Sequence, residues 1–542
     1  MTSQIFETVI RQARVVDGSG SQSYIADIGI IEGVISDVAP DLSVKHAKRI
    51  IDADGLVAAP GFIDSHSHDD VYLLADPNGA AKIRQGITTV IIGNCGFSIA
   101  PILPENQSQA MASLAIIGAN HLPRKLDQGW RFSQFLDILE QVQPAINVVP
   151  LVGHGTLRIA AMGIDNRPAD FEDRLRMRGL LEEAMRAGAF GLSSGLVYVP
   201  GAFANTDELI DLARVTAANG GLYTTHMRSE ADQVMNAIDE ALEIGKQAQL
   251  PVHISHHKVM GRKNWGRSQE TLEYLQKARV EGMRVTCDVY PYTAGSTFLA
   301  SALPPSIQAE GSEVFAEKLK NQIVRSEIRK IIENETSGDW ENLIYVDTFE
   351  GMVLVRAPRN PQYCGRSIAD IAEKERRDPY DVFFDLVVEE KMDAVIVEFM
   401  MQEDDVIRIL KSPFSMVATD GLPGFGSDMF HPRFTGAFPR VLGRYVREKQ
   451  CLTLEQAVWK MTGLPADTFG LNRKGHLATN YDADIVLFDP STITDQGTYE
   501  SPDLKPMGIR NVWVNGRLSL SDNVASSKRW GRVLRRRNRE PH

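Results

Sequence analysis

The feature that most constrains the fold of this chain is a pair of alternating histidines directly behind an apolar run. Residues 61–70 read GFIDSHSHDD, which places His66 and His68 two positions apart, and they follow the apolar residues Leu56-Val-Ala-Ala. The apolar run predicts a buried strand. Side chains two residues apart on a strand share a face, so both imidazoles point the same way. Two such imidazoles can bind a divalent metal if further ligands come from the ends of other strands.

Alternation of strand and helix patterns through the middle of the chain predicts a parallel α/β architecture. Helical patterns at 174–187, 206–219, 231–247 and 269–281 separate several of the apolar runs. Eight such strands predict a (β/α)8 TIM-type barrel over residues 56–474. The candidate strands are 56–66, 88–95, 147–154, 190–196, 222–226, 252–256, 284–290 and 414–420.

Two segments of the middle region do not fit this count of strands. Residues 392–400 also have the pattern of a strand. Residues 305–345 form an extra charged, helical stretch. We interpret this stretch as part of an insertion near 299–350 that acts as a lid over the site.

Both ends of the chain have the pattern of a small β domain. In residues 1–55, and again in residues 475–542, short β-rich runs alternate with turns. Because chain termini often lie close together, we expect one small β-sandwich domain formed from both ends. The basic segment 528–539 is interpreted as a solvated tail, or as a contact to an acidic surface of its own or another subunit.

The composition argues against several classes of protein. A formal net charge of −12 and a pI near 5.6 argue against nucleic acid as the main partner, since phosphate binding needs a basic face. No apolar stretch approaches the length that spans a membrane, and no signal peptide is evident. The widely spaced cysteines, Cys95, Cys287, Cys364 and Cys451, form no disulfide framework, so we expect a cytoplasmic protein. The sequence leaves the oligomeric state open.

The candidate barrel strands end in residues that bind metals, and a barrel carries its chemistry at those ends. Cys95 ends the second strand, His226 the fifth, His256 the sixth and Asp420 the eighth. Imidazole, thiolate and carboxylate are ligand types that zinc prefers. Taken singly, Cys95 could be a small buried hydrophobe, His226 a core histidine and Asp420 a turn or cap residue. Together with the two histidines of the first strand, these residues predict a metal site.

Motifs along almost the whole chain have the pattern of one family. They are GFIDSHSHDD at 61–70, TTVIIGNCG at 88–96, LVGHGTLR at 151–158, THMRSE at 225–230, ISHHKVMG at 254–261, DVYPYTAGST at 288–297, ATDGLP followed by HPR at 418–433, and VWKMTGLPA at 458–466. With these motifs the chain resembles the amidohydrolase superfamily, and within it the D-aminoacylases (N-acyl-D-amino-acid deacylases). The resemblance is specific for the family and much less specific for the substrate side chain.

The resemblance implies that Cys95, His226 and His256 hold one zinc ion tightly. His256 and its neighbour His257 face opposite sides of a strand, which leaves the choice between them open on geometry alone. The resemblance favours His256 as the ligand. His253 and His257 are then left to packing or to the support of the ligands.

The resemblance also implies a second, weaker metal position. It would consist of His66 and His68 together with Cys95 and Asp420, which both positions share. Many members of the superfamily bridge two metals with a carboxylated lysine, but the corresponding segment here, 191–197, reads GLSSGLV and has none. A cysteine bridge is the fitting substitute, and it argues against an enzyme that resembles hydantoinases or dihydroorotases.

For catalysis, the resemblance implies hydrolysis of an amide by an activated water. Zinc lowers the pKa of bound water to about 7, which makes hydroxide available at neutral pH. Asp420 would take the proton of the water and later give it to the leaving nitrogen. Tyr198 resembles the tyrosine that donates a hydrogen bond to the scissile carbonyl.

The implied substrate is a small molecule with a free carboxylate. Arg433 is the best candidate to hold that carboxylate, because a guanidinium is permanently charged and binds carboxylates through two bonds. The resemblance places three further residues around the same group, Lys258, Tyr290 and Ser296. The preference for the D enantiomer comes from the resemblance and not from the residues.

We therefore expect a zinc-dependent enzyme that hydrolyses N-acyl-D-amino acids to a carboxylate and a free D-amino acid. One alternative is another hydrolase of the superfamily that acts on a cyclic amide or a dipeptide. A second alternative is a non-catalytic metal-binding scaffold, since a fold does not fix a function. Loss of a zinc ligand or of Asp420 would indicate the scaffold, and all of these residues are present.

Overall fold

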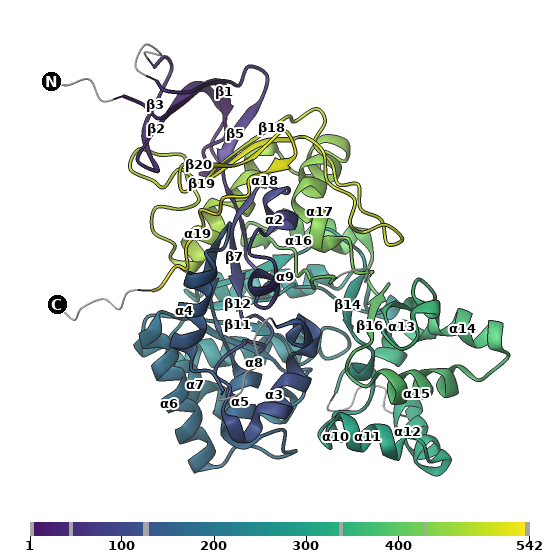
Figure 1. The fold of residues 1–542 in the computed structure, drawn as a ribbon. Coiled ribbons are helices and arrows are strands. Elements are labelled where there is room, and N and C mark those ends of the chain that lie inside the picture. Colours follow the sequence, from purple (N-terminus) through teal and green to yellow (C-terminus); the bar gives the residue numbers. More distant parts are fainter. Residues whose placement is uncertain (1–4, 43–46, 123–128, 335–339, 426–428, 537–542) are drawn as a thin grey trace.

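A closed barrel of parallel strands lies at the centre of the molecule (Figure 1). The structure, a computed structural model, describes residues 5–42, 47–122, 129–334, 340–425 and 429–536. Within these ranges eight strand positions surround the barrel axis, and Leu151 splits the third position in two. The strands are β6 (Phe62–Asp64), β7 (Ile87–Ile92), β8 (Asn147–Pro150) with β9 (Val152–Gly153), β10 (Gly191–Gly195), β11 (Leu222–His226), β12 (Val252–Ile254), β13 (Val285–Val289) and β17 (Ser415–Val417).

Backbone hydrogen bonds join these strands in parallel and close the ring. β6, β7 and β8 form one sheet, and β9 to β13 form a second sheet with β17. The Leu151 N–H donates to the Ile92 carbonyl at 2.9 Å, which continues the ladder past the split position. Between the last and first strands, the Asp420 N–H donates to the His66 carbonyl at 2.8 Å. The prediction of a (β/α)8 barrel is therefore confirmed.

Helices form around the barrel where the sequence supplies a cap and an apolar face. The Asn205 side chain accepts a hydrogen bond from the Glu208 N–H at 3.0 Å and so caps α7 (Thr206–Ala218). Leu209, Leu212 and Ala213 recur at helical spacing in α7 and are fully buried. Other helices of the barrel are α2 (Ala80–Ile83), α4 (Phe132–Val142), α5 (His154–Met162), α6 (Phe171–Ala187), α8 (Val234–Ala248), α9 (Ser268–Val280), α16 (Glu403–Lys411), α18 (Leu454–Met461) and α19 (Gly463–Phe469).

Both ends of the chain form one curled sheet beside the barrel, purple and yellow in Figure 1. Its strands are β1 (Thr8–Val15), β2 (Tyr24–Ile31), β3 (Val34–Ala39), β4 (Ile50–Asp52), β5 (Val57–Pro60), β18 (Ile485–Phe488), β19 (Ile509–Val514), β20 (Arg517–Ser521) and β21 (Val524–Ala525). The Ile35 N–H donates to the Tyr481 carbonyl at 2.8 Å, so the N-terminal strands curl back onto the segment before β18. The sheet encloses a core of its own that includes Ile28, Ile485 and Trp513, all buried.

The apolar run predicted to start the first barrel strand belongs to the curled sheet instead. Residues 56–66 contain two strands, β5 and β6, with Gly61 between them. β5 pairs in parallel with β1 and antiparallel with β18. A continuous apolar run has no periodicity that distinguishes one buried strand from two, so the pattern could not locate the break.

A further unit is inserted between the last two barrel strands, and Figure 1 shows it at the side of the barrel. We call residues 295–398 the inserted unit. Its strands β14 (Gly295–Phe298), β15 (Met352–Arg356) and β16 (Val395–Glu398) pair antiparallel, with β16 in the middle. Its helices are α10 (Pro305–Gln308), α11 (Ser312–Lys318), α12 (Gln322–Asn334), α13 (Leu343–Gly351), α14 (Ile368–Glu375) and α15 (Pro379–Glu390). The strand predicted at 392–400 is β16, which lies outside the barrel, and the insertion predicted near 299–350 falls within this longer unit.

The basic C-terminal segment packs onto its own barrel. Val533 forms a parallel bridge with Val148 of β8, and the Leu534 N–H donates to the Val148 carbonyl at 2.8 Å. Arg535 forms ion pairs with Asp137 and Glu140 of α4 at 2.6 and 2.8 Å. Of the two interpretations offered above, contact with an acidic surface of its own chain describes this segment up to residue 536. Residues 537–539 lie outside the described part of the chain.

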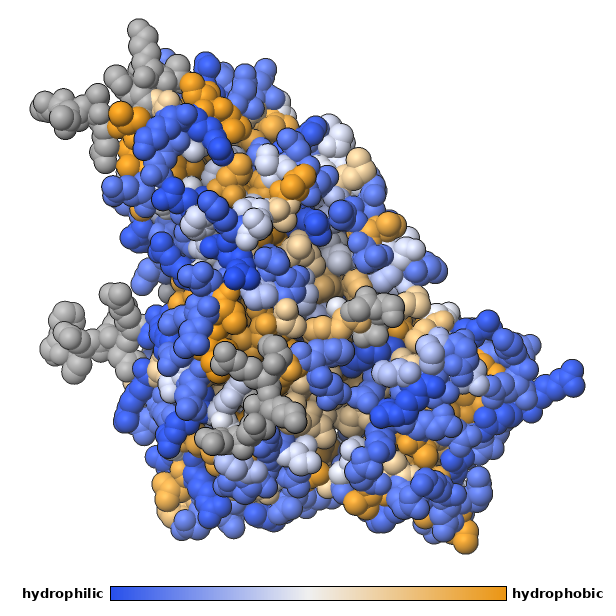
Figure 2. Space-filling view, in the orientation of Figure 1, coloured by the Kyte–Doolittle hydropathy of each residue, from blue (hydrophilic) through white to orange (hydrophobic). Residues whose placement is uncertain are grey.

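Hydrophilic side chains cover most of the face shown in Figure 2, with apolar side chains in scattered patches. The most exposed large apolar residues include Phe171 of α6 and Val280 of α9, which are single side chains on separate helices. Among the helices of the described ranges, none combines the length and the apolar character that a membrane crossing requires.

Candidate metal centre

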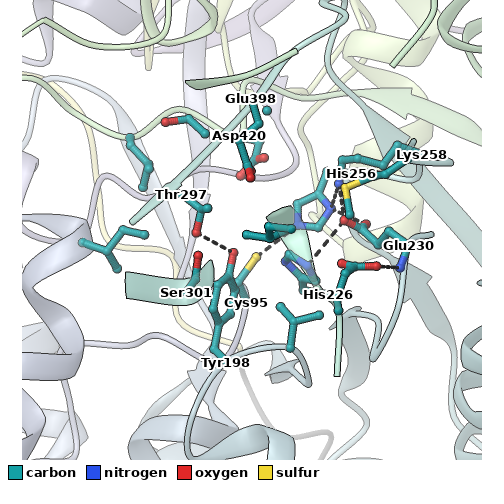
Figure 3. A pocket seen from close by; sticks show the side chains of 18 of the residues that line it. Cys95, Tyr198, His226, Glu230, His256, Lys258, Thr297, Ser301, Glu398 and Asp420 are labelled. Atoms are coloured by element: carbon teal, nitrogen blue, oxygen red, sulfur yellow. Dashed lines mark hydrogen bonds and ion pairs between the residues drawn. The ribbon is translucent and has the colours of Figure 1, made fainter. Parts of the chain in front are cut away.

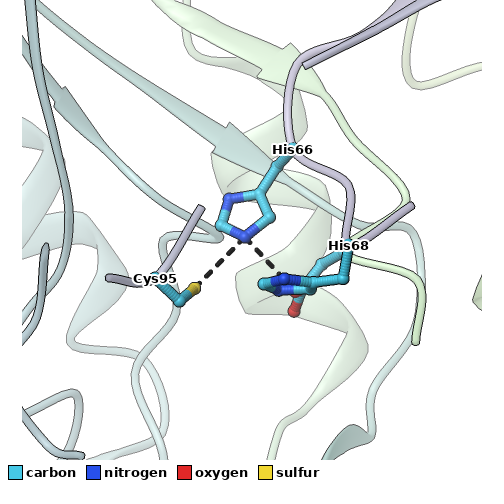
Figure 4. A group of neighbouring side chains, drawn as sticks. His66, His68 and Cys95 are labelled. Carbon is cyan, nitrogen blue, oxygen red and sulfur yellow. Dashed lines mark hydrogen bonds and ion pairs between the residues drawn. The ribbon is translucent and has the colours of Figure 1, made fainter. Parts of the chain in front are cut away.

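Cys95 lies at the centre of a cluster that forms where the barrel strands end. Its sulfur is 3.2 Å from Nε2 of His66 and 3.3 Å from Nε2 of His256. Figure 4 shows His66, His68 and Cys95 converging from two strand ends. All three side chains are buried, so their polar atoms have lost most of their contact with water.

Two groups of potential ligand atoms share this sulfur. The first group consists of His66, His68, Cys95 and Asp420, whose ligand atoms all lie within 4.8 Å of one another. In it, Nε2 of His66 and Nε2 of His68 are 3.4 and 3.3 Å from the same Asp420 oxygen, Oδ1. The second group consists of Cys95, His226 and His256, again within 4.8 Å. The structure thus brings together all six residues predicted as metal ligands.

The donor set of both groups fits zinc. Zinc binds thiolate, imidazole and carboxylate ligands, and a thiol must lose its proton to bind. Although burial alone would raise it, His66 and His256 hold the pKa of the Cys95 thiol well below its usual range. Nδ1 of His226 is buried and has no hydrogen-bond partner, which leaves its lone pair available to a metal.

Three of these residues have a backbone conformation that side chains other than glycine rarely adopt. The φ angles are 52° at Cys95, 34° at His256 and 45° at Asp420. Each such residue costs about 1–3 kcal/mol, and such conformations gather at functional sites. Each of the three lies just beyond a barrel strand, where the turn in the backbone aims its side chain at the cluster.

Glu230 supports the two histidines of the second group. Its Oε1 is 3.0 Å from Nδ1 of His256, and its Oε2 is 3.4 Å from Nε2 of His226. Lys258 donates to the same carboxylate at 2.6 Å. Although burial alone would raise it, Lys258 and the two imidazoles hold the pKa of Glu230 well below its usual range. A charged carboxylate in this position orients the imidazoles and strengthens them as ligands.

Asp288, near the end of β13, contacts three histidines in and beside the cluster. It accepts a hydrogen bond from the His256 N–H at 2.7 Å and contacts Nε2 of His253 at 2.6 Å and Nδ1 of His66 at 3.6 Å. Although burial alone would raise it, His66 and His253 hold the pKa of Asp288 well below its usual range. His253 therefore pairs with Asp288 and belongs to neither of the two metal groups.

The adjacent histidines that follow β12, His256 and His257, point in different directions. His256 joins the cluster, whereas Nε2 of His257 lies 2.8 Å from the Thr271 hydroxyl of α9. His154 also follows a strand, but its Nε2 lies 2.8 Å from Glu208 and takes no part in the metal groups of the described residues.

The four residues predicted to bind substrate line one cavity together with five of the six predicted metal ligands, all except His66. Arg433 is buried, with Nη1 2.8 Å from Oδ2 of Asp420 and its guanidinium 4.5 Å from the ring centre of Tyr290. Ser296 also lines the cavity, but its hydroxyl donates to the Ile396 carbonyl at 2.8 Å. Lys258 also lines the cavity, but its ammonium group forms an ion pair with the Glu230 carboxylate of the same chain.

Tyr198 also lines the cavity, and Figure 3 shows it beside Thr297 and apart from Lys258. Its ring packs against His226, with ring centres 5.0 Å apart, and against Phe97 and Phe298. Its hydroxyl lies 3.5 Å from the Thr297 hydroxyl. Burial and the charge of Cys95 raise the pKa of Tyr198 well above its usual range, so the phenol keeps a proton that it can donate.

The Asp420 carboxyl has the opposite shift. Although burial alone would raise it, Arg433 and His256 hold the pKa of Asp420 well below its usual range.

Sequence reasoning missed four carboxylates near the cavity, namely Glu230, Asp288, Glu341 and Glu398. Glu230 follows His226 by four residues and Asp288 lies near a strand end, so both lay within quoted motifs and could have been found. Glu341 and Glu398 belong to the inserted unit, and no pattern in the sequence connects them to the barrel ends.

Known proteins are similar to this chain over almost its whole length. The model of the amidohydrolase family matches residues 49–321 and 369–519. A D-aminoacylase from Alcaligenes xylosoxydans xylosoxydans is 39% identical over 534 residues, 98% of each chain. An N-acyl-D-glutamate deacylase from the same organism is 38% identical over 531 residues, 98% of this chain and 96% of the relative.

A solved structure is similar over the same length. It is the N-acyl-D-glutamate deacylase of Bordetella bronchiseptica, complexed with zinc and a phosphonate inhibitor, a mimic of the reaction tetrahedral intermediate. Its TM-score is 0.83 at 36% identity, and the match covers 98% of this chain and 100% of that chain.

Proposed function

The chain belongs to the amidohydrolase family, and from this premise we propose that it is a zinc-dependent deacylase of N-acyl-D-amino acids. The observation that carries the proposal is the shared cavity. A zinc-binding cluster centred on Cys95 lines it together with Arg433, a buried cation suited to a carboxylate. The reaction releases a carboxylate from the acyl group and a free D-amino acid.

Cys95, His226 and His256 would hold the tight zinc, and His66 and His68 would hold a weaker second ion with Cys95 and Asp420. When bound, zinc supplies a water of lowered pKa and polarises the scissile carbonyl. Glu230 and Asp288 keep the imidazoles in place, which is the usual task of carboxylates behind metal ligands.

Asp420 is the group that moves the proton. It takes a proton from the attacking water and returns it to the nitrogen of the leaving amino acid. Its position supports both steps, because Oδ1 faces the two histidines of the first group and Oδ2 faces Arg433. Tyr198 donates a hydrogen bond to the oxygen of the scissile carbonyl as negative charge develops there.

Arg433 holds the α-carboxylate of the substrate. Its Nε has no hydrogen-bond partner and its Nη1 has no well-aligned one, so the guanidinium has donors to offer. The carbonyl at the metal cluster and the carboxylate at Arg433 fix two points of the substrate. With these two points fixed, the side chains of the D and L enantiomers point to different parts of the cavity. The cavity can therefore bind one enantiomer and exclude the other.

The alternatives have less support. A cyclic-amide hydrolase of this superfamily would usually carry a bridging lysine on β10, where this chain has Ser193 and Ser194. A non-catalytic scaffold would have no need to retain Asp420, Tyr198 and Arg433 around one cavity.

We also propose that the protein works in the reducing cytoplasm. All four cysteines are free, and two of them, Cys95 and Cys287, are buried. A thiolate that must bind a metal is protected from oxidation in such a compartment.

Amine release from paired N-acetyl-D- and N-acetyl-L-amino acids tests the function. We expect zinc-dependent release from the D series alone, and loss of release when a chelator removes the metal. Zinc content must be measured in parallel, because release that persists in verified metal-free protein would exclude the mechanism. Opening of dihydropyrimidine or hydantoin rings, followed by the loss of ring absorbance because no amine is released, without turnover of N-acetyl-D-amino acids, would favour the cyclic-amide alternative.

A further inference from the structure

One wall of the substrate cavity contains a buried carboxylate without a partner. Glu398 lies at the end of β16 in the inserted unit and lines the cavity together with Asp420 and Arg433 (Figure 3). The residue is 2% exposed, and its Oε1 has no hydrogen-bond partner. Buried carboxylates are normally paired or hydrogen-bonded, so an unpaired one that faces a binding cavity indicates a missing ligand group.

The cations of the cavity are already engaged by other carboxylates. Lys258 pairs with Glu230 at 2.6 Å and Arg433 pairs with Asp420 at 2.8 Å. Among the residues that the structure describes, Glu398 has no cation within ion-pair distance. A second acidic residue of the inserted unit, Glu341, lines the same cavity. Burial, together with the nearby Asp347 and Glu341, raises the pKa of Glu398 well above its usual range.

The cavity also has an apolar part to its lining. Met260, Leu343 and Met400 line the cavity and are each less than a tenth exposed. An apolar wall that ends in an unpaired carboxylate matches a side chain with a methylene stem and a charged end. Lysine, ornithine and arginine have this construction. A cation would favour the charged form of Glu398, whereas a glutamate or aspartate side chain would offer no cation and would raise the pKa of this carboxyl further.

We propose that this cavity selects N-acyl-D-amino acids with a cationic side chain, and that Glu398 is the specificity-determining residue. The inference rests on the proposed deacylase function and adds the class of side chain. The overall similarity does not decide it, because the D-aminoacylase and the N-acyl-D-glutamate deacylase relatives are 39% and 38% identical to this chain. The choice must therefore come from the residues of the cavity wall.

Two substrate pairs isolate the charge from the size of the side chain. N-acetyl-D-lysine and N-acetyl-D-norleucine share a methylene stem, and N-acetyl-D-arginine and N-acetyl-D-citrulline are almost the same shape. We expect kcat/KM to be at least about tenfold higher for the cationic member of each pair, because a site built for a polar group discriminates strongly against its absence. N-acetyl-D-glutamate should be the poorest substrate of the series.

The variant Glu398→Gln tests the residue. We expect the lysine-to-norleucine and arginine-to-citrulline ratios of kcat/KM to fall to about one, since an amide of the same shape cannot pair with a cation. Glu390→Gln is the matched control, because Glu390 is a fully buried carboxylate of the same unit that does not line the cavity. It should leave both ratios unchanged. If Glu398→Gln does not fold, Glu398→Leu, which suits the apolar wall, provides the same ratios.

The outcomes distinguish this inference from the proposed function. Turnover of neutral N-acetyl-D-amino acids with norleucine equal to or better than lysine would overturn the inference and leave the deacylase function intact. A uniform loss on all substrates in Glu398→Gln would also overturn it, because it would place Glu398 at a group common to every substrate, such as the α-carboxylate. Absence of turnover with every D substrate would overturn the proposed function and the inference with it.

Discussion

At the scale of single residues, both metal groups depend on Cys95. Its sulfur is the atom that the group of His66 and His68 shares with the group of His226 and His256. The backbone around it is strained, as it is at His256 and Asp420, and each of these conformations costs about 1–3 kcal/mol. Hydrogen bonds to Glu230 and Asp288 hold His256 in place despite that cost. The site is therefore preorganised before any ligand binds.

The first prediction concerns Asp420, which should act in proton transfer more than in holding the tight zinc. In Asp420→Asn we expect kcat to fall by about 10²–10⁴-fold, because an amide cannot take the proton of the water. Zinc content should stay at about one ion per chain, since Cys95, His226 and His256 remain. Steady-state kinetics and metal analysis of the same preparation measure both quantities.

An exposed aspartate provides the control for Asp420→Asn. Asp467 of α19 has a side chain that is 73% exposed, so Asp467→Asn should change neither kinetics nor zinc content. A variant Asp420→Asn that keeps its kcat but loses its zinc would show that Asp420 is only a ligand.

The ligand types were predictable from the sequence at this scale, but their partners were not. His66, Cys95, His226 and Asp420 are recognisable because each follows a strand pattern, and strand ends meet in a barrel. The pairing of Lys258 with Glu230, in contrast, was not predicted from the sequence. Such a pairing depends on side-chain direction, which spacing along the chain does not determine.

At the scale of elements, β10 approaches the loop of Cys95 more closely than any side chain would allow. A Cβ at Gly195, the last residue of β10, would lie 2.2 Å from the Cys95 carbonyl oxygen. That oxygen belongs to the backbone and cannot rotate away. The absence of a side chain at Gly195 therefore lets the Cys95 loop sit against the strand, which fixes where the sulfur points.

The second prediction follows from this contact. In Gly195→Ala we expect the Cys95 loop to shift, zinc affinity to fall by about 10–100-fold, and activity at limiting zinc to fall with it. Isothermal titration of metal-free protein with zinc measures the affinity. Gly179→Ala in the middle of α6 is the matched control, because a Cβ there meets no atom within 4 Å. Unchanged zinc affinity in Gly195→Ala would show that the loop tolerates the displacement.

A buried charge at Glu208 joins three elements on the outer side of the barrel. It accepts a hydrogen bond from Arg158 of α5 at 2.7 Å and from the Ala169 N–H before α6 at 3.3 Å, and it lies in the first turn of α7. Although burial alone would raise it, His154 and Arg158 lower the pKa of Glu208 to about 2.

The third prediction is a pH dependence of stability that comes from Glu208. A carboxyl whose pKa is lower in the folded state than the ordinary 4.5 stabilises the fold above that pH and loses this contribution as the pH falls to about 2. A difference of this size corresponds to about 3 kcal/mol. Urea unfolding of wild type and Glu208→Gln, both metal-free, should show a gap that is widest above pH 5 and narrows toward pH 2.

Glu182→Gln serves as the comparison for Glu208→Gln. Glu182 pairs with Arg186 on the surface of α6 and is 48% exposed, so its loss should change the free energy of unfolding by less than about 1 kcal/mol at any pH. A gap between wild type and Glu208→Gln that does not change with pH would mean that the carboxylate contributes packing and not charge.

At the scale of the whole molecule, the barrel was predictable and its boundaries were not. Strand-helix alternation predicted the barrel, because each parallel strand needs a crossover helix before the next. Residues 56–66 are divided between two sheets, and their continuous apolar pattern does not show where one strand ends and the next begins. The antiparallel pairing of β14 with β16 also joins residues about 100 positions apart, and local periodicity carries no information about such a pairing.

The fourth prediction concerns the basic tail, which continues the barrel sheet on the outer side of β8. The Val148 N–H donates to the Arg532 carbonyl at 2.9 Å, the Leu534 N–H donates to the Val148 carbonyl at 2.8 Å, and Val533 between them is 9% exposed. Truncation after residue 528 should therefore lower the free energy of unfolding by at least about 2–4 kcal/mol, because it removes one buried side chain, these two backbone bonds and the bond from the Gly531 N–H to the Pro144 carbonyl. Arg535→Ala removes two ion pairs with exposed partners and one hydrogen bond to the Ala187 carbonyl, and it should cost about 1 kcal/mol or less. Because the tail lies away from the strand ends that carry the cluster, zinc content and kcat at low temperature should be the same in all three proteins. A truncated chain with wild-type stability would show that the tail rests on the barrel without supporting it.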